Sequence, residues 1–217
     1  MKVFQTKKDM VYSGIKDNIL SGVLRPGDRL HIQALAKEFS TSEIPVREAI
    51  QALESEKLVQ VTPHTGAMVA QVSARDLDEI LELRIYFEAL ATYLAAPFIT
   101  EDDAKELEKN LRKQAFAIEY NELEDFGELN LQFHKLIYQK NPNSRLNDII
   151  FNLWDHSKRY RNVFQNNLEF TKQSYDQHLE ILSIIKQKDA EKARELMEQH
   201  KIRSSAEIKS KWKRDFE

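Results

Sequence analysis

Three of the six histidines in this chain lie in helical patterns of its C-terminal part, where their side chains could bind a metal ion. His134 occurs in "LNLQFHKLIY", His178 in "SYDQHLEIL" and His200 in "ELMEQHKIR". Asn130 precedes His134 by one helical turn, so the two side chains share a helix face. Imidazole nitrogens are accepted ligands of divalent transition metals, so the three histidines are candidate metal ligands.

Convergence of these side chains requires particular helix packing. His178 and His200 belong to consecutive helical segments that we expect to be antiparallel neighbours, which would bring both imidazoles to the same level. Three rings meeting inside a helical bundle would leave coordination positions open for a ligand. Spacing alone also allows a plainer interpretation, in which each histidine is partly exposed and satisfied within its own helix.

A metal with open positions could also activate water, which would make the protein a metal-dependent hydrolase or lyase. Such an enzyme needs a general base, and Glu128 and Glu180 are the nearest candidates in the sequence. The chain has no phosphate-binding loop and no nucleophile elbow. We therefore expect a binding protein with no catalytic residues and keep the three-histidine enzyme as the alternative.

Arg84 interrupts an apolar helical stripe and has two interpretations. It could form an ion pair with Glu88 one turn later. It could instead face a pocket and bind the carboxylate of a small effector through a bidentate contact. Tyr160 and Arg161, in "SKRYRNVF", are further candidates for binding such an anion.

The elements that would position these groups are helices. An apolar stripe runs through residues 76–96 and ends at Pro97, and Thr100 is a good N-cap for a second helix. Further helical segments follow at 122–140, from about 143, from about 170 and after 189. Six helices with short connections predict an all-α antiparallel bundle over residues 73–217.

Composition indicates a globular, mainly α protein. The 217 residues are 41% hydrophobic and 31% charged, and they include only five Gly and five Pro. The absence of cysteine excludes disulfides, and no apolar run is long enough for a signal peptide or a membrane span, so we expect a cytoplasmic protein. The net charge is −3, although residues 1–72 carry a slight excess of Lys and Arg.

Residues 1–72 predict a winged helix-turn-helix. Helical patterns at 9–21 and 32–39 precede a third helix, which begins after Ser42 and runs to about Lys57. Ser42 is the expected N-cap, and Pro45 is tolerated in the first turn because its missing N–H would have no acceptor there. Alternating runs at 58–62 and 67–72 predict a β-hairpin. The third helix would enter a DNA major groove, whereas a small helical bundle with an incidental hairpin is the alternative.

Residues 11–72 resemble the DNA-binding domain of the GntR family of bacterial transcription regulators. The resemblance rests on "ILSGVLRPGDRL", "LAKEF", "PVREAIQAL" and the wing glycine. It implies that Arg47 contacts DNA, that Ser42 lies at the start of the recognition helix, and that the wing tip is formed by His64, Thr65 and Gly66. Gln33 and Glu43 occupy positions where the family commonly has arginine, so two charged contacts to DNA are replaced.

The C-terminal part resembles the FCD ligand-binding domain of the FadR subgroup. The residues that carry this resemblance are "NLQFH" and the pair His178 and His200, which are separated by 21 residues. The resemblance implies a divalent metal (Zn, Ni or Mn) on the three histidines, with Asn130 standing where the family has aspartate. Family members sense small carboxylates, sugar acids or acyl derivatives.

These features together predict a ligand-responsive bacterial transcription regulator. A homodimer would place two recognition helices on a pseudo-palindromic operator in double-stranded DNA. Residues 73–217 would form the effector-binding and dimerisation domain. The effector would be a small carboxylate or sugar acid bound near the metal, with Arg84 as one of its contacts. A DNA-binding protein that has no ligand remains a further alternative.

Overall fold

The computed structural model describes residues 6–62, 66–71, 73–158 and 167–216. The chain divides into two compact units, Met1–Ser73 and Ala74–Glu217. Each unit has a hydrophobic core of its own. The predicted fold class, a winged helix-turn-helix followed by an all-α bundle, is confirmed.

The N-terminal unit contains α1 (Lys7–Leu20), β1 (Arg29–Leu30), α2 (Ile32–Glu38), α3 (Glu43–Ser55), β2 (Val59–Thr62) and β3 (Gly66–Val69). The strands pair antiparallel in the order β1-β3-β2. The hairpin was predicted, whereas β1 was not, because a strand of two residues is too short to show alternation. The apolar face of α3 packs into the core through Val46, Ala49, Ile50 and Leu53.

The two ends of α3 each show a local feature of the backbone. Ser42 is the N-cap with extended backbone, but its side chain makes no capping hydrogen bond, so the predicted cap contact is wrong. Just beyond the C-terminus of the helix, Lys57 has φ 58°, in the left-handed region that favours glycine. Lysine at this position therefore carries a modest backbone strain. His64 and Thr65 lie outside the described residues.

The described part of the C-terminal unit contains six α-helices and one 3-10 turn. They are α4 (Ala74–Ala95), η1 (Ala96–Phe98), α5 (Glu101–Glu119), α6 (Leu123–Tyr138), α7 (Ser144–Lys158), α8 (Leu168–Lys186) and α9 (Ala190–Phe216). The predicted start of α5 is confirmed, because Thr100 and Asp103 form a reciprocal capping box. The last turns of α9 are highly charged, so apolar periodicity does not mark where this helix ends.

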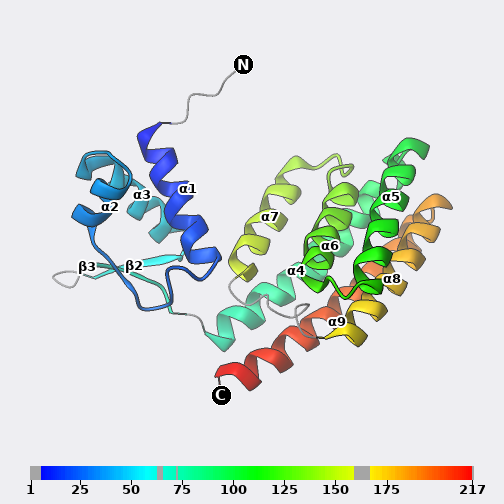
Figure 1. The fold of residues 1–217 in the computed structure, drawn as a ribbon. Helices are drawn as coiled ribbons and strands as arrows, with labels where there is room; N and C mark the ends of the chain where they lie inside the picture. The colour runs from blue at the N-terminus through cyan, green and yellow to red at the C-terminus, as the bar shows by residue number, and fades with distance from the viewer. Residues whose placement is uncertain (1–5, 63–65, 72, 159–166, 217) are drawn as a thin grey trace. The chain divides into compact units, whose positions relative to one another are not determined.

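The long helix α4 packs against α9, α7 and α6, while α5 packs against α6 and α8 (Figure 1). The core between these helices is apolar at residues such as Phe133, Ile137 and Ile181. A compact set of polar side chains is buried beside that core, and it includes all three candidate histidines. No helix among the described residues is long and apolar enough to cross a lipid bilayer.

Candidate metal centre

The structure brings the three candidate histidines together from three different helices. His134 of α6, His178 of α8 and His200 of α9 have exposed fractions of 1%, 0% and 1%. One potential ligand atom from each lies within 4.8 Å of the other two. His178 and His200 lie in the middle of α8 and α9, and their rings reach the same level of the bundle, as the sequence predicted.

Two glutamines fix which ring nitrogen of the imidazoles carries the proton. His178 Nδ1 lies 2.9 Å from Gln114 Oε1, and His200 Nδ1 lies 2.9 Å from Gln177 Oε1. An amide oxygen only accepts hydrogen bonds, so each Nδ1 must donate, which leaves each Nε2 with its lone pair free. The orientation of Gln114 is itself fixed, because its amide nitrogen donates to Asn110 Oδ1 at 2.7 Å.

His134 has the same arrangement in a weaker form. Its Nδ1 lies 3.4 Å from the hydroxyl oxygen of Tyr138, whose own proton is donated to Glu88. His134 Nε2 then faces His200 Nε2 at 3.2 Å. Two lone pairs at this distance repel each other unless a proton or a cation lies between them. Two nitrogens bound to one tetrahedral zinc ion at about 2.1 Å would be about 3.4 Å apart, so the observed spacing suits a shared metal.

Two buried acceptors near this cluster have no hydrogen-bond partner among the described residues. They are His178 Nε2 and Asn130 Oδ1. Buried polar atoms are normally paired, so two unpaired acceptors beside two further imidazoles form an arrangement that a cation would satisfy. Three imidazoles and one amide oxygen form a donor set that suits zinc, nickel or manganese. The residues present therefore fit the metal that the sequence implied.

Burial lowers the pKa of all three histidines well below its ordinary value, because the protonated ring would lose its hydration. The ammonium group of Lys201 lowers these pKa values further. His178 also lowers the pKa of His134 and of His200. The imidazoles are therefore neutral at pH 7. A neutral imidazole keeps the lone pair that a metal ion requires.

A second buried cluster lies beside the histidines and centres on Glu88 of α4. Glu88 is fully buried and accepts contacts from four side chains. Arg84 Nε and Trp154 Nε1 lie 2.7 and 3.0 Å from Oε1, and Lys201 Nζ and the Tyr138 hydroxyl both lie 2.8 Å from Oε2. Burial alone would raise the pKa of Glu88, but the neighbouring cations and donors lower it to about 2. One carboxylate thus faces two cations, and a positive charge remains.

A small cavity of about 40 Å³ joins the two clusters. The residues that line it include Arg84, Asn130, His134, Trp154, His200 and Lys201. The ion pair of Arg84 with Glu88 is confirmed. Its side chain also borders the cavity, and its contact with an effector stays a prediction. Sequence reasoning missed Lys201, whose only signal was its position next to His200.

The remaining candidates are Tyr160, Arg161, Glu128 and Glu180. Tyr160 and Arg161 lie outside the described residues. Glu128 and Glu180, the candidate general bases of a hydrolase, are exposed and do not line the cavity. Neither of the two general bases considered for a metal-dependent hydrolase therefore lies at the histidine cluster.

In the N-terminal unit, α3 presents the face opposite its core contacts to solvent. Arg47 is exposed and forms an ion pair with Glu43, with Arg47 Nη2 2.9 Å from Glu43 Oε2. Ser42, Gln33 and Gly66 are also exposed. An exposed ion pair of this kind contributes little to stability, so Arg47 is free to change partners.

Comparison with known proteins decides the family. Residues 7–69 match the pattern described as "Bacterial regulatory proteins, gntR family", and residues 79–203 match the FCD domain. The chain belongs to the GntR family. It is a transcription regulator of the type that carries an FCD domain, and the relatives are regulators and not enzymes.

Three relatives illustrate the similarity of this GntR regulator to known proteins. The HTH-type transcriptional repressor RspR of Escherichia coli is 30% identical over 90% of this chain and 86% of its own length. The gluconate operon transcriptional repressor of Bacillus subtilis is 30% identical over 64% of this chain and 57% of its own length. The structure of E. coli McbR/YncC has a TM-score of 0.77 at 27% identity and covers 96% of this chain and 100% of that one.

Replacing Glu88 tests the buried charge cluster. Glu88→Gln leaves Arg84 and Lys201 as buried cations without a carboxylate, so we expect a loss of about 3–5 kcal/mol in the free energy of unfolding. Glu79→Gln is the matched control, because Glu79 pairs with Arg75 at the same spacing on the same helix but is exposed. The control should lose less than about 0.5 kcal/mol. Urea denaturation followed by circular dichroism measures both values.

The pH dependence of this effect has a defined sign. The folded-state pKa of Glu88 is lowered to about 2 from an ordinary value of 4.5. The stabilisation that Glu88 contributes is therefore fully present above pH 4.5 and is lost as the pH falls from there toward 2. The difference between the wild-type protein and Glu88→Gln should be constant between pH 6 and 8 and should shrink below pH 4.5; a constant difference down to pH 3 would contradict the assignment.

Proposed function

We propose that this GntR regulator is a homodimeric, metal-containing repressor or activator of the FadR subgroup, switched by a small carboxylate or sugar acid. The observation that carries the proposal is the buried histidine cluster. Three imidazoles whose Nε2 atoms are available as ligands meet beside an orphaned amide oxygen and a cavity with cationic walls. A helical bundle that only needed stability would fill this space with apolar side chains.

His134, His178 and His200 would hold the metal, with Asn130 as a fourth ligand. The metal would supply positive charge and open coordination positions for an anionic group. Asn130 is neutral, so no carboxylate of the protein reduces the charge of the metal in this donor set. Gln114 and Gln177 would keep the rings of His178 and His200 in the orientation that binding requires.

The effector would be an anion, because the cavity beside the metal ligands carries more positive than negative charge. Arg84 and Lys201 border the cavity, and Glu88 neutralises only one of them. The guanidinium of Arg84 also donates to Ser157 Oγ at 3.0 Å, which holds its planar group in place. A carboxylate suits this arrangement, and one similar protein is named a repressor of a gluconate operon.

The cavity is built in a way that could couple ligand binding to movement. Its lining comes from α4, α6, α7, α8 and α9, so an anion that bridges the metal and Arg84 would draw different helices together. The ligand shifts the equilibrium only if it binds one arrangement of the helices more tightly than the other. The helix α4 follows the winged unit directly in the chain and would carry that change toward it.

The winged unit would bind a pseudo-palindromic operator through α3 of each protomer. Arg47 would contact DNA, and Glu43 can accept a hydrogen bond from cytosine N4 in the major groove. Ser42 and Gln33 would lie near the start of the same contact surface, and Gly66 would belong to the wing together with His64 and Thr65. The exposed Arg47–Glu43 pair would open or reorient when DNA is bound.

Metal and ligand binding can be tested together. The protein as purified should contain about one divalent metal ion per chain, measured by elemental analysis. Small carboxylates and sugar acids should raise its melting temperature, and a chelator should abolish these shifts. His178→Ala should lose both the metal and the shifts. His31→Ala is the matched control, since His31 is exposed in the N-terminal unit. Ligand shifts of unchanged size in His178→Ala would refute the site.

The role of Arg47 can be measured on the promoter of the gene that encodes the protein. Arg47→Ala should weaken specific binding by about 1–3 kcal/mol and, if the contact is to phosphate, reduce the salt slope by about one. Lys105→Ala is the control, because Lys105 is exposed on α5 in the other unit. Glu43→Gln, which frees Arg47 from its partner, should not weaken binding as Arg47→Ala does. Equal affinity of the Arg47→Ala and wild-type proteins in a fluorescence anisotropy titration would remove Arg47 from the interface.

A further inference from the structure

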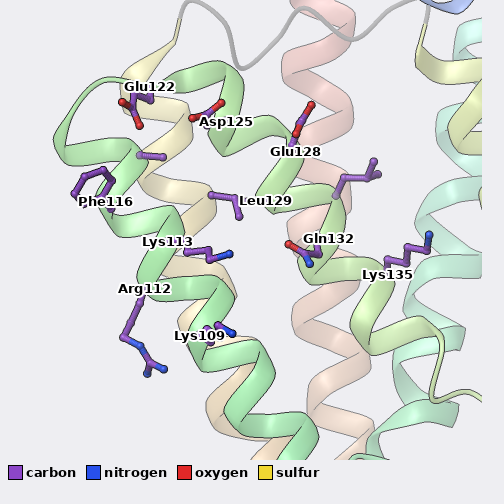
Figure 2. Close-up of a pocket in the computed structure, with 12 residues that line it drawn as sticks. Lys109, Arg112, Lys113, Phe116, Glu122, Asp125, Glu128, Leu129, Gln132 and Lys135 are labelled. Carbon is purple, nitrogen blue, oxygen red and sulfur yellow. The ribbon is translucent and has the colours of Figure 1, made fainter. Parts of the chain in front are cut away.

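A wide open groove of about 1040 Å³ runs between α5 and α6 on the surface of the helical unit (Figure 2). It lies outside the metal centre, and it shares only Leu131 with the lining of the cavity described above. Phe116, Ala117 and Leu129 form its apolar middle part. None of the functions proposed so far uses this groove.

The charges of the groove are separated along its length. Lys109, Arg112 and Lys113 of α5 lie at one end, and Figure 2 shows Glu122, Asp125 and Glu128 toward the other. All six side chains are exposed. The salt bridges found among the described residues of the bundle join other side chains, such as Lys186 with Glu108 and Lys140 with Asp103. A surface that is only solvated would mix positive and negative side chains, whereas the charged residues that line this groove are separated by sign.

An exposed aromatic pair stands beside the groove on α5. Phe116 and Tyr120 have exposed fractions of 54% and 58%, and their ring centroids are 4.3 Å apart. Aromatic side chains at such exposure are typical of the central part of protein interfaces. Phe116 belongs to the apolar lining of the groove, and Tyr120 extends that exposed apolar surface along α5.

We propose that the groove between α5 and α6 is the surface through which two copies of this chain pair. A two-fold axis through the middle of the groove would place the basic end of one copy on the acidic end of the other, and the reverse contact would form at the same time. The same axis would set α5 of one copy against α5 of the other, so the exposed Phe116–Tyr120 pairs of the two copies would be buried at this interface. This assignment rests on the homodimer proposed above and adds the surface that forms it.

The charge pattern also argues for a second copy over other occupants. Nucleic acid would be attracted by Lys109 and Arg112 but repelled by the acidic end only a few helical turns away. Three cations facing three anions is a self-complementary set, which an isologous interface requires. Lys135, which also lines the groove on α6, adds a fourth cation and lies beside Gln132 and not at the acidic end (Figure 2).

Charge reversal tests the assignment. One variant carries Lys109→Glu, Arg112→Glu and Lys113→Glu, and the other carries Glu122→Lys, Asp125→Lys and Glu128→Lys. Each variant alone would face itself with like charges and should be a monomer of about 25.4 kDa by analytical ultracentrifugation. An equimolar mixture should form a heterodimer of twice that mass, because opposite charges then meet at both ends.

The control removes the same number of positive charges elsewhere, with Lys172→Glu, Lys192→Glu and Arg194→Glu on exposed positions of α8 and α9. This control should remain a dimer like the wild-type protein, and circular dichroism and metal content establish that all variants are folded.

The possible outcomes separate the two proposals. A wild-type protein that is monomeric would overturn the homodimer itself. A wild-type dimer with both reversed variants also dimeric would leave the homodimer standing and remove the groove as its surface. Reversed variants that are monomeric but fail to associate when mixed would overturn the two-fold pairing of opposite ends. Restored dimer in the mixture alone supports the assignment.

Discussion

The arrangement of the helical unit depends on a carboxylate that is withdrawn completely from water. A charged Glu88 in an apolar core would be very costly without partners. One of its four partners lies on its own helix and the other three lie on three further helices: Arg84 on α4, Tyr138 on α6, Trp154 on α7 and Lys201 on α9. These contacts fix how the four helices approach one another. Satisfying one buried charge therefore sets the geometry of the cavity beside it.

The histidine cluster is held by the same kind of constraint. Lys201 contacts Glu88 and, as a nearby cation, also disfavours protonation of all three imidazoles. Gln114 orients His178 and is itself held by Asn110, whose amide nitrogen donates to the Leu129 carbonyl oxygen and to Gln132 Oε1, both at 3.1 Å. Neutral rings with fixed orientations form a donor set that is already organised for the proposed metal ion. Binding of that ion would then require little rearrangement.

Much of the fold was predicted because its signals are local. The apolar stripe of α4, the Thr100–Asp103 capping box and the hairpin alternation each depend on residues a few positions apart. The signals that failed were weaker or conflicting. Two-residue β1 has no periodicity to detect, and the Ser42 side chain does not make the capping contact that its residue type favours.

The sequence by itself determined the order of the elements, the helix-turn-helix with its wing, and the identity of the histidines and Asn130 as candidate ligands. Only the tertiary structure decided that Lys201 and Glu88 belong beside those ligands, that Gln114 and Gln177 orient two of the rings, and that Arg84 both pairs and faces the cavity. The physical reason is distance along the chain. Helix periodicity reports which face a residue occupies, whereas the partner across a buried contact is chosen by the packing of segments that lie far apart in sequence.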